Sequence, residues 1–302
     1  MRGGRPVLGK RFINAVSFLT IIKTPEAFYR QEKDIAGSMV YFPLVGLMIG
    51  FFMCLSFFLL NLFLPLFLAV LFTVIFEIII TGGAHIDGLA DMFDGLFSGK
   101  KDRKEILAIM KKSDVGMFGI LSIVFMVILK LALLYFFALA RSPAAMPGPE
   151  DLAGFYVFLL FMPGFGRWSM NYMLAGYKNA REGPGLAKVF TGDKNRSRYF
   201  NISSAYFFIL YLILVLGGSI LRIYLQEGAV FGLSACPIES FRIHLFAAVL
   251  LILSFMIMLI MAQGWFFTRR TKGVTGDIAG GTSEITEVMF LLVVFIIQNY
   301  IY

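Results

Sequence analysis

Three aspartates stand at a spacing that suits a metal site. Asp87, Asp91 and Asp94 occur in the stretch GGAHIDGLADMFDGLFSGK, between segments that are almost purely apolar. A helix turns by about 100° per residue, so a helix here would place the three carboxylates on one narrow stripe. Their mutual repulsion would be offset by a dication that prefers oxygen ligands, such as Mg²⁺ or Mn²⁺. We therefore expect Asp87, Asp91 and Asp94 to bind this metal and to act in catalysis.

A solvated acidic helix end is the alternative interpretation of this stripe. Such a face usually mixes Lys and Glu four residues apart, whereas the basic run here starts only at Lys100. Gly88 and Gly95 lie beside the stripe, and residues this small would let a bulky ligand approach the carboxylates. His85 would point to the opposite side of the helix, so we expect it to pack against other helices or to lie at the membrane interface, and not to act as a base.

Further polar residues extend the candidate site. Asp114, in KSDVGMFG, is either a helix-start residue favoured by the helix dipole or a fourth metal ligand, and the residues leave both readings open. Arg167 stands inside an apolar segment, where it must find an anion, and its planar guanidinium suits a phosphate. The candidates for binding substrate or phosphate are Lys111, Arg167, Arg181, Asp277 and Glu284. For Glu284, near the start of the last apolar segment, complementarity to the helix dipole is an equally good explanation.

The composition places these residues in a membrane protein. Of the 302 residues, 59% are hydrophobic and only 15% are charged, and the mean hydropathy is +0.81. Apolar runs reach the roughly 20 residues that a membrane-spanning helix needs. The sequence therefore predicts an all-α polytopic membrane protein with about seven transmembrane helices. We expect them near residues 38–62, 65–83, 115–141, 152–176, 199–224, 242–267 and 284–302.

The distribution of Lys and Arg predicts the orientation of the chain. These residues concentrate in four segments, 1–33, 97–112, 177–198 and 268–276, which alternate with nearly neutral loops. The positive-inside rule then places the N-terminus in the cytoplasm and, with seven spans, the C-terminus outside. The net charge of +8 is accordingly read as a topology signal and not as a sign of nucleic-acid binding.

The N-terminal part is expected to lie on the membrane surface. Residues 8–24 have the pattern of an amphipathic interfacial helix, with Phe12, Phe18 and Leu19 as its apolar anchors. We expect a single integral membrane domain over residues 1–302, with 1–33 as a cytoplasmic interfacial segment and 38–302 as a helical bundle.

The polar clusters all fall at the predicted cytoplasmic ends of the spans, which favours one active site. A metabolite or cation transporter is the alternative. It would place ionisable residues near the membrane midplane and often contain inverted repeats, and no clear repeat is present. Glu77 and Lys130 are ionisable residues at such a depth, and Lys130 either is a partner for Glu77 or faces a polar cavity.

Several of these motifs together resemble the cobalamin synthase family, the adenosylcobinamide-GDP ribazoletransferases. The segments that carry the resemblance are HIDGLADMFDGL, IMKKSDVGMFG, GRWSMNYMLAGY and GVTGDIAGGTSEITEVMFLL, and they extend over most of the chain. The sequence departs from the family pattern between Tyr177 and Arg181, where Lys178 and Asn179 interrupt a usually tighter run. A CDP-alcohol phosphotransferase fits less well, because its motif has Arg where this chain has Asp91.

The resemblance implies a bacterial enzyme of the cytoplasmic (inner) membrane, with its active site on the cytoplasmic side. It would join adenosylcobinamide-GDP to α-ribazole or α-ribazole 5′-phosphate and release GMP, a late step of cobalamin assembly. The reaction is a phosphoryl-type transfer, for which the aspartate stripe would hold Mg²⁺, with Mn²⁺ possible, and Arg and Lys would bind phosphate oxygens. The oligomeric state is left open by the sequence.

Overall fold

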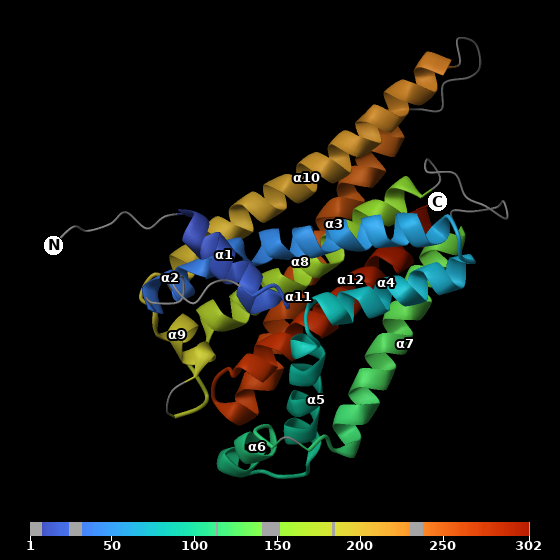
Figure 1. Cartoon of the computed structure of the whole chain (residues 1–302). Helices are drawn as coiled ribbons and strands as arrows, with labels where there is room; N and C mark the ends of the chain where they lie inside the picture. The colour runs from blue at the N-terminus through green and yellow to red at the C-terminus, as the bar shows by residue number, and fades with distance from the viewer. Residues whose placement is uncertain are drawn as a thin grey trace.

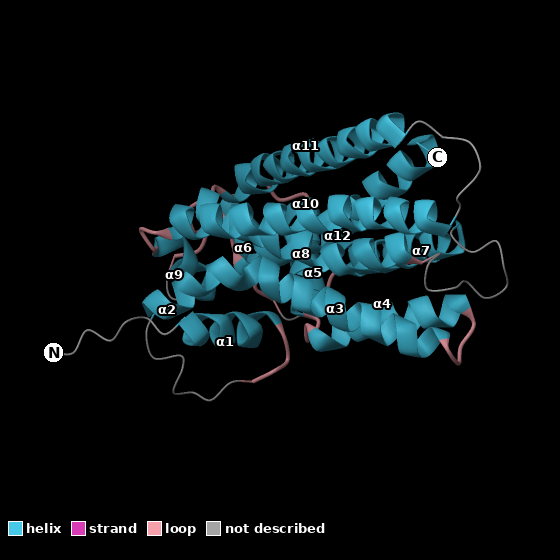
Figure 2. Cartoon of the chain, turned by 90° about the horizontal axis from the view of Figure 1, so that it is seen from above, coloured by secondary structure: helices cyan, strands magenta, loops and turns pink. Residues whose placement is uncertain are grey.

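The computed structural model describes residues 8–23, 32–112, 114–140, 152–182, 185–229 and 238–301. Within these ranges the chain consists of helices and turns, with β-structure limited to one isolated bridge between Asn179 and Val274. The expected all-α fold is therefore confirmed. Figure 1 follows the helices along the chain, and Figure 2 shows the longer ones side by side along a common direction.

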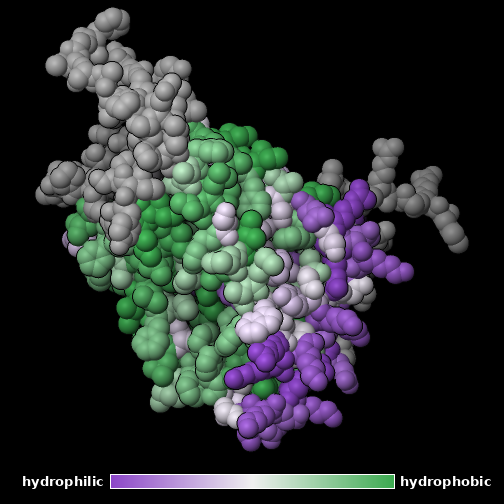
Figure 3. All heavy atoms as spheres, turned by 180° about the vertical axis from the view of Figure 1, so that it is seen from behind, coloured by the Kyte–Doolittle hydropathy of each residue, from purple (hydrophilic) through white to green (hydrophobic). Residues whose placement is uncertain are grey.

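A bundle of long helices makes up most of the described structure. Its members are α3 (Phe42–Asn61), α4 (Leu66–Ile80), α7 (Met117–Ala140), α8 (Ala153–Gly176), α10 (Arg196–Ala229), α11 (Ile238–Thr271) and α12 (Gly276–Ile301). Shorter elements gather toward one end, called here the polar end: α1 (Leu8–Leu19), α2 (Glu32–Gly37), the 3-10 helix η2 (Ser38–Tyr41), α6 (Arg103–Ile109) and α9 (Leu186–Gly192). In Figure 3 hydrophilic residues collect along one side of the molecule, while hydrophobic residues cover most of the remaining visible surface.

The chain is a multi-pass membrane protein by the length and composition of its helices. Five described helices could each cross a membrane, and a sixth span results if α4 and α5 (Ala84–Phe97) are counted as one bent pair. The expected count of seven is not confirmed. Helix α8 is 24 residues long, but its composition is not apolar enough for it to be counted as a membrane span. Arg167, Ser169 and Asn171 of this helix are fully buried by its neighbours, and a helix shielded from lipid does not need an apolar surface.

Two glycines turn the chain sharply between α4 and α5. The helix axes differ by 84°, and Gly82 and Gly83 adopt φ angles of 65° and 69°. Only glycine enters this left-handed region at little cost. The turn ends α4 at Ile80 and directs α5 out of line with it, so that α5 packs against α6, α7 and α12. The aspartate stripe is therefore carried on a separate helix that lies across the end of the second predicted span.

Helix α8 lies at the centre of the bundle and packs closely against α3. Glycines at two positions of α3, Gly46 and Gly50, let the two backbones approach. A methyl group at Gly46 would lie 2.5 Å from the Pro163 carbonyl oxygen, and one at Gly50 would collide with the Leu160 carbonyl oxygen. Small residues serve the same purpose in many membrane helix pairs.

Helix α1 forms within the predicted amphipathic segment, but its expected anchors contact protein. Phe18 stacks on Phe42 at a ring distance of 5.5 Å, Phe12 lies edge-on to Tyr41 at 5.8 Å, and Leu19 is buried. The location of α1 at a membrane surface remains a prediction.

The expectation that residues 1–302 form a single domain also remains a prediction. Residues 1–7 and 24–31 of the proposed interfacial segment and the C-terminal Tyr302 lie outside the described residues.

The last helix begins earlier than the sequence indicated. The seventh span was expected near residues 284–302, whereas α12 starts at Gly276. Thr275 Oγ1 accepts a hydrogen bond from the Ile278 N–H at 3.2 Å, which is the usual way to cap a helix start. Asp277 therefore lies in the first turn of α12, and Glu284 lies about two turns inside it.

Replacing Gly50 by Ala tests the close contact between α3 and α8. The added methyl group meets backbone, which cannot move aside as a side chain can, so we expect a loss of about 3 kcal/mol in unfolding free energy. The matched control is Gly176→Ala at the end of α8, where a methyl group would meet nothing within 4 Å. Thermal unfolding of the purified proteins in detergent gives the comparison. Equal melting temperatures for the two variants would contradict the packing described here.

Candidate active site

The aspartate stripe is present on α5 as the sequence predicted. Asp87, Asp91 and Asp94 all lie within one helix of 14 residues. Asp87 is exposed, while Asp91 and Asp94 are partly buried. The stripe therefore has one freely accessible carboxylate and two that neighbouring residues partly cover.

Asp94 has a structural partner that sequence spacing could not show. Its Oδ2 accepts a hydrogen bond from the Gly116 N–H at 2.6 Å, and its Oδ1 accepts one from the Gly119 N–H at 2.8 Å. These N–H groups belong to the start of α7, where a carboxylate satisfies donors that have no partner in the helix. Asp94 thus fixes α7 to α5, and both of its oxygens are engaged.

The glycines beside the stripe make room for other helices. A methyl group at Gly88 would lie 2.9 Å from the Asp277 carbonyl oxygen, and one at Gly95 would collide with the Met110 side chain. The expectation that these glycines admit a ligand is therefore wrong for both positions. Gly88 instead brings the Asp277 backbone, at the start of α12, against α5 beside the stripe.

A short backbone pairing brings two distant loops to the same place. Val274 donates its N–H to the Lys178 carbonyl at 2.8 Å, and Ala180 donates its N–H to the Val274 carbonyl, also at 2.8 Å. The Arg103 guanidinium, from α6, donates to the Ala180 carbonyl oxygen. The loops after α8 and α11 are thereby joined to α6, although they are far apart in the sequence. The pairing includes Lys178 and Asn179, the residues that depart from the family pattern.

This pairing positions Arg181 beside the start of α12. Its guanidinium donates to Asp277 Oδ2 at 2.7 Å and to the Met110 carbonyl oxygen at 3.2 Å. The Arg181 and Asp277 side chains are 34% and 23% exposed, so both remain accessible to a ligand. Thr275 Oγ1 lies 3.3 Å from the same Asp277 oxygen.

The stripe and the start of α12 form one electrostatic unit. Asp91 is repelled by Asp277, Asp87 and Asp94 and attracted by Arg181. Unlike Asp94, the carboxylates of Asp87, Asp91 and Asp277 accept no hydrogen bond from a backbone N–H group in the described structure. Among the described residues, the one cation that acts on this group is Arg181. Such an excess of negative charge favours a bound cation, whereas the guanidinium and the N–H groups at the start of α12 favour a phosphate.

The described residues contain no ready-made cage for a metal. No three side chains of His, Cys, Asp or Glu among them converge as a set of ligands. Mg²⁺ does not require one, because it is commonly held by one or two carboxylates together with substrate phosphates and water. Asp87 and Asp91 are oxygen donors of this kind on one helix face, so the residues fit a magnesium ion that binds together with a phosphate substrate.

Lys111 and Asp114 lie outside this arrangement. Both side chains are exposed, and in the described structure neither forms a hydrogen bond or ion pair with the stripe. Their assigned roles, in binding phosphate and metal respectively, remain predictions without geometric support.

Two other candidates, Arg167 and Glu284, belong to a buried ion cluster. The Lys130 ammonium donates to Glu77 at 3.0 Å, to Glu284 at 3.0 Å and to Glu287 at 2.7 Å. The Arg167 guanidinium donates to the other oxygen of Glu287. The structure thus gives these residues protein partners in place of a substrate.

Burial separates this cluster from the stripe. Arg167 and Glu287 are fully buried, and Lys130, Glu77 and Glu284 are at most 7% exposed. Five charged groups from four helices, α4, α7, α8 and α12, thus pair with one another inside the bundle, so Arg167 and Glu284 cannot reach a phosphate at the surface.

Part of this cluster was visible in the sequence and part was not. The pairing of Lys130 with Glu77 is confirmed, and His85 is buried as expected, with Nδ1 3.4 Å from Arg167. The role of Glu287 was missed, because its place near the start of the predicted span left complementarity to the helix dipole and a functional role equally open. The one signal was its spacing of three residues from Glu284, which puts both carboxylates on one face of α12.

Comparison with known proteins covers nearly the whole chain. Residues 11–295 match the family model described as cobalamin-5-phosphate synthase. Two curated proteins named adenosylcobinamide-GDP ribazoletransferase are similar. The one from Acetivibrio thermocellus is 30% identical over 96% of this chain and 98% of its own length. The one from Geotalea daltonii is 31% identical over 92% of this chain and 94% of its own length. No solved structure matches the chain.

Replacing Asp94 by Asn tests whether this residue holds α7. An amide keeps one acceptor but turns an NH₂ group toward a backbone N–H, so we expect a loss of about 2 kcal/mol in unfolding free energy. Asp87→Asn is the control, since its exposed carboxylate has no such partner. Thermal unfolding in detergent measures both. If Asp94→Asn unfolds at the same temperature as Asp87→Asn, the two hydrogen bonds do not hold the helix.

Replacing Lys130 by Met tests the buried ion cluster. The change leaves three buried carboxylates with one guanidinium, and removing one partner of a buried ion pair costs about 3 to 5 kcal/mol. The control is Lys100→Met, which breaks a surface pair with Glu105 whose side chains are 51% and 52% exposed. That pair should contribute about 1 kcal/mol or less. Similar losses of unfolding free energy in the two variants would mean that the buried cluster does not hold the helices together.

Proposed function

The chain belongs to the cobalamin-5-phosphate synthase family, and from this premise we propose that it joins adenosylcobinamide-GDP to α-ribazole or α-ribazole 5′-phosphate. The names of its full-length relatives support this reaction. A ribose hydroxyl of the α-ribazole attacks the phosphate that is attached to the cobinamide. A new phosphodiester forms, the bond to GMP breaks, and GMP leaves. A substrate with two linked phosphates needs a site that neutralises negative charge and holds the reacting groups in line.

The contact of α5 with α12 is the observation that carries the location of this site. Gly88 packs on the backbone of Asp277, so the first turn of α12 lies beside the aspartate stripe, and Arg181 reaches Asp277 from a third segment. A methyl group at Gly276 would meet nothing within 4 Å, so there is open space at the helix start. The phosphates of adenosylcobinamide-GDP bind in this space, where Arg181 and the free N–H groups of the first turn face them.

Asp87 and Asp91 hold Mg²⁺ at the same place, with Mn²⁺ as a substitute. When bound, the ion neutralises charge on the phosphates and on the departing GMP. Asp87 is exposed and Asp91 is partly buried, so both can contact a ligand. Asp94 acts as a positioning residue, because its two oxygens hold the start of α7. Asp277, the carboxylate of this group that does not hold the metal, accepts the proton of the attacking hydroxyl.

The orientation of the protein follows from its charge. We place the polar end, with the N-terminus and the site, on the cytoplasmic side of the bacterial inner membrane, because the basic segments collect there. With α8 counted as a shielded span and α4 with α5 as one bent span, the C-terminus lies outside. Cytoplasmic adenosylcobinamide-GDP would then reach the site without crossing the bilayer.

Replacing Asp87 and Asp91 singly by Asn tests the location of the site. We expect each variant to fold and to lose at least about 100-fold in turnover, because a group that stabilises charge in the transition state is removed. The control is Glu105→Gln, which removes an exposed carboxylate elsewhere on the polar end. The assay follows GMP release from adenosylcobinamide-GDP and α-ribazole by purified protein across a Mg²⁺ titration. Near-normal turnover in both Asn variants, or full activity in EDTA, would exclude the stripe from the reaction.

A further inference from the structure

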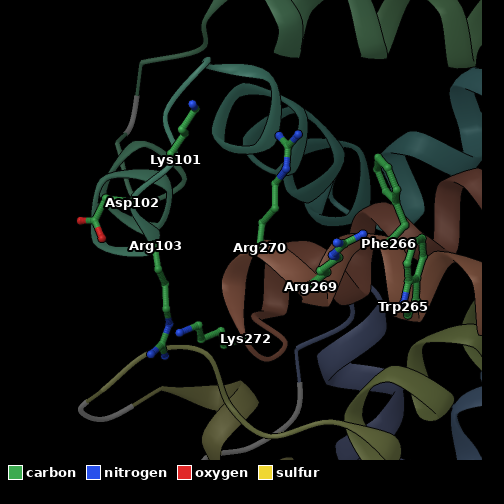
Figure 4. Close-up of a pocket in the computed structure, with 8 residues that line it drawn as sticks. All are labelled: Lys101, Asp102, Arg103, Trp265, Phe266, Arg269, Arg270 and Lys272. Carbon is green, nitrogen blue, oxygen red and sulfur yellow. The ribbon is translucent and has the colours of Figure 1, made fainter.

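A basic pocket lies between α6 and the end of α11, apart from the aspartate stripe. It has a volume of about 630 Å³ and is lined by five cations, Lys101, Arg103, Arg269, Arg270 and Lys272. The carboxylate of Asp102, also on its rim, points away from the basic side chains in Figure 4. None of the aspartates of α5 lines this pocket. So many cations around one open space predict a multiply charged anionic ligand.

Two of the five cations are fixed by backbone, which leaves three free to bind. The Arg103 guanidinium donates to the Ala180 carbonyl oxygen, and the Arg270 guanidinium donates to the Leu96 carbonyl oxygen at the end of α5. Lys101, Arg269 and Lys272 are exposed and form no ion pair in the described structure. The fixed arginines hold the pocket open, and the exposed cations surround its mouth.

The wall opposite α6 is aromatic and exposed. Trp265 and Phe266 line it and are 61% and 48% exposed, and the Arg269 guanidinium lies 5.2 Å from the centre of the Trp265 ring. Both rings stand near the end of α11, in a segment that is long and apolar enough to cross a membrane. Aromatic residues with adjacent cations are typical of the membrane–water interface.

An apolar stripe leads from the membrane to this pocket. Leu251, Met258, Met261 and Trp265 are exposed and recur at intervals of seven, three and four residues, so they share one face of α11. The next position on that face is Arg269. The face thus presents hydrocarbon along the span and positive charge at its end, in the order of an acyl chain followed by its headgroup.

We propose that this pocket binds the phosphate headgroup of an anionic phospholipid, with an acyl chain along α11. A nucleotide phosphate would satisfy the same cations, but it would leave the apolar stripe and the exposed aromatic wall without a function. Basic pockets at the cytoplasmic ends of membrane helices commonly bind anionic lipids in this way. The lipid would also bridge the end of α11 to α6, while Arg270 ties that end to α5 and Arg103 ties α6 to the loop after α8.

Tryptophan fluorescence in proteoliposomes measures this binding directly. The chain has two tryptophans, and only Trp265 is exposed, because Trp168 is 4% exposed. Brominated phosphatidylglycerol is added as a minor component to phosphatidylcholine vesicles, and the quenching is compared with that by brominated phosphatidylcholine at the same fraction. We expect stronger quenching by the anionic lipid, by about twofold or more. Trp265→Phe gives the background from Trp168.

Matched charge variants assign the preference to the pocket. The pocket variant carries Lys101→Gln, Arg269→Gln and Lys272→Gln, and the control carries Lys188→Gln, Lys194→Gln and Arg198→Gln, three exposed cations elsewhere on the polar end. The first should abolish the preference for anionic lipid and the second should keep it. Arg269→Gln alone should reduce the preference and replaces the triple variant if that variant does not fold.

Three results would overturn the proposal. They are equal quenching by both lipids in the wild type, equal loss of the preference in both triple variants, and an unchanged preference in the pocket variant with a raised KM for adenosylcobinamide-GDP. The last result would assign the pocket to the nucleotide. The quenching does not depend on catalysis, so it tests the lipid site even if the proposed reaction is wrong.

Discussion

The buried ammonium of Lys130 constrains the arrangement of the whole bundle. It contacts carboxylates from α4 and α12, and Arg167 extends the cluster to α8 through Glu287. Charges at this depth are tolerated only when each finds its partner, because neither lipid nor the apolar core can solvate them. The helices cannot slide or rotate relative to one another without separating these pairs. The cluster therefore fixes the register of α12 against α4, α7 and α8.

The register of α12 decides what faces the aspartate stripe. The ion pairs at Glu284 and Glu287 lie two to three turns along the helix from Asp277, so they set the position of the helix start. Gly88 then permits the close approach of α5 to the start of α12, and Arg181, from a third segment, donates a hydrogen bond to Asp277. The proposed phosphate site is thus assembled from three segments that share no sequence neighbourhood. Its polar groups are held at the surface by charges that are themselves inaccessible to substrate.

Helix periodicity was sufficient to predict the features that lie within one helix. The stripe of Asp87, Asp91 and Asp94, the buried side of His85 and the all-helical bundle follow from spacing and composition alone. The roles of individual residues depended on partners in other helices, which spacing cannot supply. In the sequence Asp94 looked equivalent to Asp87, but in the structure it accepts hydrogen bonds from the N–H groups of Gly116 and Gly119. Arg167 looked free to bind phosphate, but in the structure it is paired with Glu287. Apolar runs likewise predicted seven spans, but α8 is not apolar enough to be counted as one, because it carries polar residues that its neighbours bury.

The central claim is that substrate phosphates bind between the aspartate stripe and the first turn of α12. An experimental structure of the full chain in lipid nanodiscs with GMP and Mg²⁺ bound tests it most directly. The account predicts the GMP phosphate near Arg181 and the start of α12, with the metal ion against Asp87 and Asp91. A GMP molecule bound in the basic pocket beside Arg269 and Arg270, with no metal at the stripe, would contradict it.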